Sequence, residues 1–116
     1  MAASDLENTT WKLASYFEGT ALHDLPSSAE VTLTFQDGAA GGKSACNRYR
    51  SEAKIGDGTL AFGMAMGTRM ACPPPLMEIE GTYLRTLEAV ATWRISDDTL
   101  ELRDGAGKTL LVFARG

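Results

Sequence analysis

The stretch Val31-Thr32-Leu33-Thr34-Phe35-Gln36-Asp37-Gly38 decides the fold class, because it joins a strand to a hairpin turn. Its apolar side chains alternate with threonines, which is the pattern of a strand with one buried face. Asp37-Gly38 predicts a tight turn, since glycine accepts the positive φ that two-residue hairpin loops require. We therefore expect the chain to return as an antiparallel strand over residues 39–43.

Working outward, the same alternation predicts strands on both sides of this hairpin. They are expected over residues 11–17, 47–55, 60–67, 91–95, 100–102 and 109–114. Residues 22–28 are expected to form a loop, because Pro26 blocks ladder pairing and the neighbouring serines favour turns. The small residues at alternate positions between Ala61 and Gly67 suggest that another backbone or a helix lies close over that face.

One helix is expected at about residues 75–90. Pro73-Pro74-Pro75 interrupts strand pairing, and proline is well tolerated in a first helical turn. An apolar stripe with helical spacing follows, formed by Leu76, Ile79, Tyr83, Leu87 and Val90. Gly81 is expected to allow close approach to the small-residue face of the sheet.

The predicted fold class is thus α+β and mainly β. We expect a strongly curved antiparallel sheet or partly closed barrel of about seven or eight short strands with one helix. Residues 1–9 are expected to be a flexible N-terminal segment and residues 10–116 a single domain.

Composition excludes several classes of protein. The chain has 116 residues and a net charge of −4, which does not favour nucleic-acid binding. Lys43, Arg48 and Arg50 could contact RNA, but solvated positions at the end of a strand are the preferred interpretation. No apolar run is long enough for a transmembrane span. The start is polar and acidic, unlike a signal peptide, so the chain is either cytosolic or a mature domain whose export signal is absent from it.

The residues that could support catalysis are few, and we expect no enzymatic activity, no metal and no cofactor. His23 is the only histidine, and no nucleophile elbow accompanies it. The acidic pairs Glu78 with Glu80 and Asp97 with Asp98 fall at a helix start and in a turn, where solvated charge is the expected role. A hydrolase or redox enzyme using His23 or Cys72 is the opposing hypothesis.

Cys46 and Cys72 are the only cysteines and lie 26 positions apart. They could form a disulfide, remain buried as thiols, or act as metal ligands with His23. A zinc site needs more ligands than these. An oxidising compartment favours the disulfide and a cytosol favours the thiols.

Two ordered motifs resemble the signatures of the META domain (HslJ-like) family. Gly42-Lys43-Ser44-Ala45-Cys46-Asn47-Arg48-Tyr49 resembles Gly-x-x-Gly-Cys-Asn-x-[Tyr/Phe], and Thr68-Arg69-Met70-Ala71-Cys72 resembles Thr-x-Met-Ala-Cys. Ala45 stands where the family usually has glycine, and this difference bears only on the local geometry of the turn. The signature residues are Gly42, Cys46, Asn47, Thr68, Met70, Ala71 and Cys72.

The resemblance implies an antiparallel β-rich domain in the bacterial cell envelope, in a family that has no established enzymatic activity and is linked to heat shock. We therefore expect a monomeric, stress-related or assembly-related binding module in the periplasm or at the outer membrane, the cytoplasm being the second choice. Its partner is expected to be an envelope protein or a lipid. The alternatives are a purely structural module and a lipid-binding, pilot-like domain.

Two candidate sites follow from these hypotheses. Asn47, Thr68 and Arg69 could form a small recognition site, although a bracing role for the two signature loops is preferred. Alternatively, an apolar ligand face could lie inside the barrel, where a methionine-rich wall could hold an acyl chain. That face is predicted to consist of Leu60, Phe62, Met64 and Met66.

Overall fold

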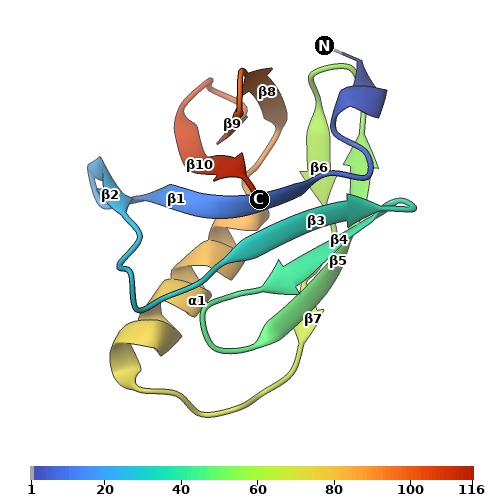
Figure 1. The fold of residues 1–116 in the computed structure, drawn as a ribbon. Helices are drawn as coiled ribbons and strands as arrows, with labels where there is room; N and C mark the ends of the chain where they lie inside the picture. Colours follow the sequence, from blue (N-terminus) through green and yellow to red (C-terminus); the bar gives the residue numbers. More distant parts are fainter. Residues whose placement is uncertain (1) are drawn as a thin grey trace.

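The computed structural model, which describes residues 2–116, shows an antiparallel sheet curled into a barrel-like shape beside one helix (Figure 1). The strands are β1 (Thr10–Glu18), β2 (Ala21–Asp24), β3 (Thr32–Gln36), β4 (Ala39–Lys43), β5 (Arg48–Ile55), β6 (Leu60–Phe62), β7 (Met66–Gly67), β8 (Thr92–Ser96), β9 (Thr99–Arg103) and β10 (Thr109–Arg115). The helices are α1 (Pro74–Leu87) and the short 3-10 helix η1 (Ala3–Asp5). The predicted fold class is confirmed.

Eight strands follow one path around the sheet, in the order β6-β5-β4-β3-β1-β10-β9-β8. The end strands meet at a Thr59–Thr92 bridge, where the amide of Leu60 donates to the carbonyl of Ala91 at 3.0 Å. We call the junction between the end strands β6 and β8 the seam, and the bridge joins one half of it. β7 lies along the other half and pairs only with β5 among the described strands.

The core lies between the curved sheet and α1, which Figure 1 shows behind β1 and β3. The predicted helical stripe supplies Ile79, Tyr83 and Leu87, which are buried. Tyr83 packs edge-on against Tyr49 of β5 and Phe113 of β10, with ring centroids 5.4 Å and 6.5 Å apart. The helix is therefore held to both sides of the curled sheet by apolar packing.

The start of the chain differs from the expected flexible segment. Within residues 2–9, η1 leads into Leu6, whose side chain is fully buried in the core. The amide of Asn8 donates to the carbonyl of Phe35 at 2.9 Å. Met1 lies outside the described residues. The packed start covers one edge of the core.

Two further predictions about local structure were wrong. The loop expected at residues 22–28 begins as strand β2, which pairs with β1 after a turn at Gly19, where φ is 69°. The single strand expected over residues 60–67 is interrupted between β6 and β7.

Of the two close neighbours expected for the small-residue face, another backbone or a helix, the structure has another backbone at Gly67. A methyl group added at Gly67 would collide with the carbonyl of Arg48 on β5, so the close neighbour is the adjacent strand. One added at Gly81 would meet the side chain of Arg85 in the same helix, 3.2 Å away. The close helix–sheet approach predicted through Gly81 is therefore not found.

Candidate functional site

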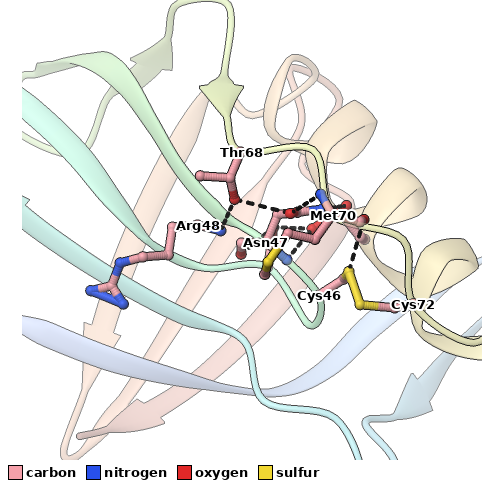
Figure 2. The surroundings of a disulfide bond; sticks show 8 residues. Cys46, Asn47, Arg48, Thr68, Met70 and Cys72 are labelled. Carbon is pink, nitrogen blue, oxygen red and sulfur yellow. Dashed lines mark hydrogen bonds between the residues drawn. A yellow bond between two sulfur atoms is a disulfide. The ribbon is translucent and has the colours of Figure 1, made fainter.

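The two signature motifs meet at one place, the turn of residues 44–47 between β4 and β5 and the segment of residues 68–72 between β7 and α1 (Figure 2). A disulfide joins Cys46 to Cys72, with the Cα atoms 6.0 Å apart. Of the three alternatives for the cysteines, the structure thus has the disulfide. The Sγ atom of Cys46 lies 3.3 Å from the carbonyl oxygen of Met70, a contact without a proton because the sulfur is oxidised.

The side chain of Asn47 connects these loops by hydrogen bonds (Figure 2). Its Oδ1 accepts from the Thr68 hydroxyl at 2.9 Å and from the Met70 amide at 2.7 Å. Its Nδ2 donates to the Met70 carbonyl at 3.3 Å and to Oε2 of Glu80 at 2.9 Å. The amide's capacity is thereby filled from within the protein. This favours the bracing role predicted for Asn47 and Thr68 over recognition.

Glu80 was expected to be a solvated charge, and this was wrong, because its residue is only 7% exposed. Its Oε1 accepts from the Ser44 hydroxyl at 2.5 Å and from the backbone amide of Asn47 at 2.8 Å. Burial by itself raises the pKa of this carboxyl, but the hydrogen bonds from Ser44 and Asn47 outweigh burial and hold the pKa below its ordinary value. Glu80 is therefore an ionised buried acceptor.

The turn that presents these donors depends on Ala45. Its φ is 78°, in the left-handed region that favours glycine. The amide of Ala45 donates to the carbonyl of Glu30 at 2.9 Å, which holds the turn against the segment before β3. The position where the sequence departs from the family signature is therefore one where the backbone conformation suits glycine.

A buried pair of tyrosines lies next to this turn. The Tyr49 hydroxyl donates to the carbonyl of Thr32 at 2.7 Å and lies 2.5 Å from the Tyr83 hydroxyl, which is then the donor between the two rings. Burial raises the pKa of both hydroxyls, so both stay protonated at neutral pH. Their arrangement serves to fix α1 to β5.

A surface groove of about 750 Å³ runs between the segment of residues 64–71 and α1. Four methionines line it: Met64, Met66, Met70 and Met77, which are 82%, 74%, 59% and 41% exposed. We call it the methionine groove. Among the described residues, the other exposed large apolar side chain is Leu22 on β2. Exposed apolar side chains that gather in one place indicate an interaction site more strongly than scattered ones do.

The apolar ligand face predicted from the sequence is divided between two environments. Leu60 is buried in the core, and Phe62 is half-buried and stacks on Phe35 with ring centroids 6.2 Å apart. Met64 and Met66 are instead exposed and line the methionine groove on the surface. The four residues therefore form no common wall inside the barrel, because the chain breaks between β6 and β7.

Charged side chains border the methionine groove. Arg48 and Arg69 line it, and neither forms an ion pair within residues 2–116. The one acidic side chain in the lining is Glu80, whose two oxygens already accept three hydrogen bonds from Ser44 and Asn47. The free charge at the groove is therefore positive, although the protein as a whole is acidic.

Neither residue of the enzymatic hypothesis, His23 or Cys72, lines the methionine groove. His23 is exposed on β2, with Nε2 3.1 Å from the carbonyl oxygen of Glu18, and Cys72 has no free thiol. Over residues 2–116, no group of three or more histidine, cysteine or acidic side chains is placed to hold a metal ion. Within the same part of the chain, no helix has the length and hydropathy to cross a membrane.

Both the sequence and the fold are similar to those of known proteins. The sequence profile of the META domain family matches residues 4–116. An NMR structure of a protein from Burkholderia xenovorans is 33% identical, with a TM-score of 0.81 over 98% of this chain and 86% of that one. A second NMR structure shares the fold at 24% identity, with a TM-score of 0.73 over 99% of this chain and 95% of that one. No curated protein matches the sequence.

Proposed function

Because the chain belongs to the META domain family, we propose that it is a non-catalytic binding module of the bacterial cell envelope. In this proposal the methionine groove receives an apolar part of a partner during envelope stress or assembly. The disulfide-linked loops keep one wall of the groove in place against the helix.

The observation that carries this proposal is the gathering of four exposed methionines around one groove. Removing exposed apolar side chains from water stabilises a complex with a partner by roughly 25 cal/mol per Å² of apolar surface buried. Methionine is unbranched and polarizable, so it adapts to partners of different shape.

The disulfide supports the proposed location in the periplasm or at the outer membrane. Disulfides persist in oxidising compartments and are rare in the cytosol, where thiols are kept reduced. The bond also joins the segment that carries Met70 to the turn that holds Glu80. An oxidising location would therefore preserve the shape of the groove.

The experiment that tests this proposal uses protein labelled with ¹³C at the methyl groups of methionine and leucine. Dodecyl maltoside, added below its critical micelle concentration, serves as an uncharged probe with one apolar chain. We expect saturable NMR shifts at Met64, Met66, Met70 and Met77, and unchanged methyl signals at Leu22. No saturable shift, or equal shifts at Leu22, would contradict the proposal.

A pair of variants sharpens the result. Met64→Glu with Met66→Glu places charge on the rim and should abolish the saturable shifts at Met70 and Met77. Both positions are exposed, so the fold should remain intact. Leu22→Glu is the matched control, since it changes an exposed apolar residue outside the groove and should leave binding unchanged.

A further inference from the structure

We infer that the methionine groove binds an extended, acidic and apolar peptide segment of another protein, which adds as a strand to the free edge of β7. This inference rests on the proposed function and names the chemistry of the partner. The partner is recognised by its backbone, by apolar side chains on one face and by carboxylates on the other.

The unfilled part of the barrel seam gives the first reason. The seam between β6 and β8 is joined at the Thr59–Thr92 bridge, whereas β7 pairs with β5 on one side and faces the groove on the other. A strand edge presents unpaired amides and carbonyls, which makes it a template for strand addition. The groove lies where a further strand would continue the sheet.

The direction of the backbone groups gives the second reason. Thr68 donates its amide to the carbonyl of Arg48 at 3.0 Å, and Met70 donates its amide to Oδ1 of Asn47 at 2.7 Å. β7 ends at Gly67, and backbone groups alternate in direction along an extended chain, so we expect the amides of Gly67 and Arg69 to face the groove. An added strand would pair with these groups.

The two faces of such a strand would meet different side chains. Met66 pairs with the exposed Arg50, and Gly67 pairs with the buried Tyr49, so the ladder has an outer and an inner face at β7. On the inner side, Met77 and Leu84 of α1 line the groove and suit apolar side chains. Side chains on the outer side would face solvent near the basic rim.

The positive charge at the rim of the groove favours acidic residues in the partner. Arg48 and Arg69 border the groove without ion pairs among the described residues, and both oxygens of Glu80 are already hydrogen-bonded. Carboxylates on the outer face of the peptide would supply the missing counter-charges. A pattern of alternating apolar and acidic residues fits both faces. A lipid surface would leave the backbone edge of β7 unpaired, so the peptide is favoured.

The test uses a synthetic ten-residue peptide that alternates valine with glutamate, and isothermal titration against the intact protein. Two N-methylated versions, one methylated at every valine and one at every glutamate, distinguish strand addition from simple apolar contact. Only one set of amides can face β7, so we expect one version to bind at least about tenfold more weakly and the other to bind normally. Hydrogen exchange at the amides of Gly67 and Arg69 should slow in the complex.

Charge is tested by the same peptide with lysine in place of glutamate, which should bind more weakly. Arg48→Ala and Arg69→Ala should each weaken binding of the glutamate peptide about two- to fivefold. Arg94→Ala, an exposed arginine outside the groove, is the matched control and should have no effect.

Several outcomes would overturn the inference. They are equal binding of both N-methylated versions, equal binding of the lysine peptide, unchanged exchange at Gly67 and Arg69, or binding to vesicles of anionic phospholipid in place of the peptide. If dodecyl maltoside still shifts the groove methionines while the peptide does not bind, the inference fails and the proposed function stands. If neither binds, both fail.

Discussion

The carboxylate of Glu80 accepts two hydrogen bonds from Asn47, one from its backbone amide at 2.8 Å and one from its side-chain amide at 2.9 Å. The pair fixes the middle of α1 to the turn before β5, across 33 positions of sequence. Because the other face of the Asn47 side chain holds Thr68 and Met70, the pair also positions one wall of the methionine groove.

Replacing Glu80 should therefore destabilise the protein. Glu80→Gln removes the charge and places an amide group among donors that need acceptors, so we expect a loss of about 1.5–3 kcal/mol in the free energy of unfolding. Urea denaturation measures this loss. Glu78→Gln changes an exposed carboxylate in the same helix and should alter stability by less than about 0.5 kcal/mol. Equal effects of the two variants would contradict the role given to Glu80.

The same carboxylate predicts how stability depends on pH. The hydrogen bonds hold the pKa of Glu80 in the folded protein below its ordinary value of 4.5. A depressed pKa means that ionised Glu80 stabilises the fold above that ordinary value, and that this contribution is lost as pH falls through the folded pKa. Urea denaturation between pH 3 and 7 should show a steeper acid decline for the wild type than for Glu80→Gln. Parallel curves would exclude Glu80 as a source of the decline.

The disulfide should contribute substantially to stability. In the chain-entropy account, closing a loop of 26 positions restricts the unfolded chain and contributes about 3–4 kcal/mol. Cys46→Ala with Cys72→Ala should lower the free energy of unfolding by that amount, and reduction of the wild type should give a similar loss. Thiol titration of the native protein should find no free thiol. A loss below about 1 kcal/mol would contradict this chain-entropy account of the disulfide.

Ala45→Gly tests the left-handed turn. Glycine relieves strain of about 1–2 kcal/mol at this φ, but it removes a buried methyl and adds freedom to the unfolded chain, each costing about 0.5–1 kcal/mol. The variant should therefore lie within about 0.5 kcal/mol of the wild type. Ala40→Gly in β4 loses the same methyl without relief of strain and should cost about 1–2 kcal/mol. Thermal unfolding of both variants compares them, and an equal cost would show that Ala45 is unstrained.

Local patterns predicted most of the fold. The alternation at Leu33 and Phe35 and the turn at Asp37-Gly38 gave the β3–β4 hairpin, in which both turn residues have positive φ. The helical stripe predicted α1, which ends at Leu87, a few residues before the predicted end. These features follow from side-chain spacing and turn chemistry, which act over short distances.

The features that were missed depend on distant partners. Leu6 lies in a polar segment, and its burial results from packing by elements later in the chain. Glu80 follows Ile79 on the helix, and its donors come from a turn far away in sequence, so helical spacing cannot distinguish it from the solvated Glu78. The division of Leu60 and Phe62 from Met64 and Met66 likewise depends on where β5 stops pairing with β6 and starts pairing with β7.

The position of β1 in the sheet has a consequence for the folding of the chain. β1 lies between β3 and β10, and Trp11 pairs with both Leu33 and Arg115. The first long strand therefore gains its second neighbour only after nearly the whole polypeptide has been made. Such non-local pairing is typical of folding on the millisecond-to-second scale. A chain emerging residue by residue must keep one side of β1 exposed until its last strand arrives, and during that interval it is most vulnerable to aggregation and proteolysis.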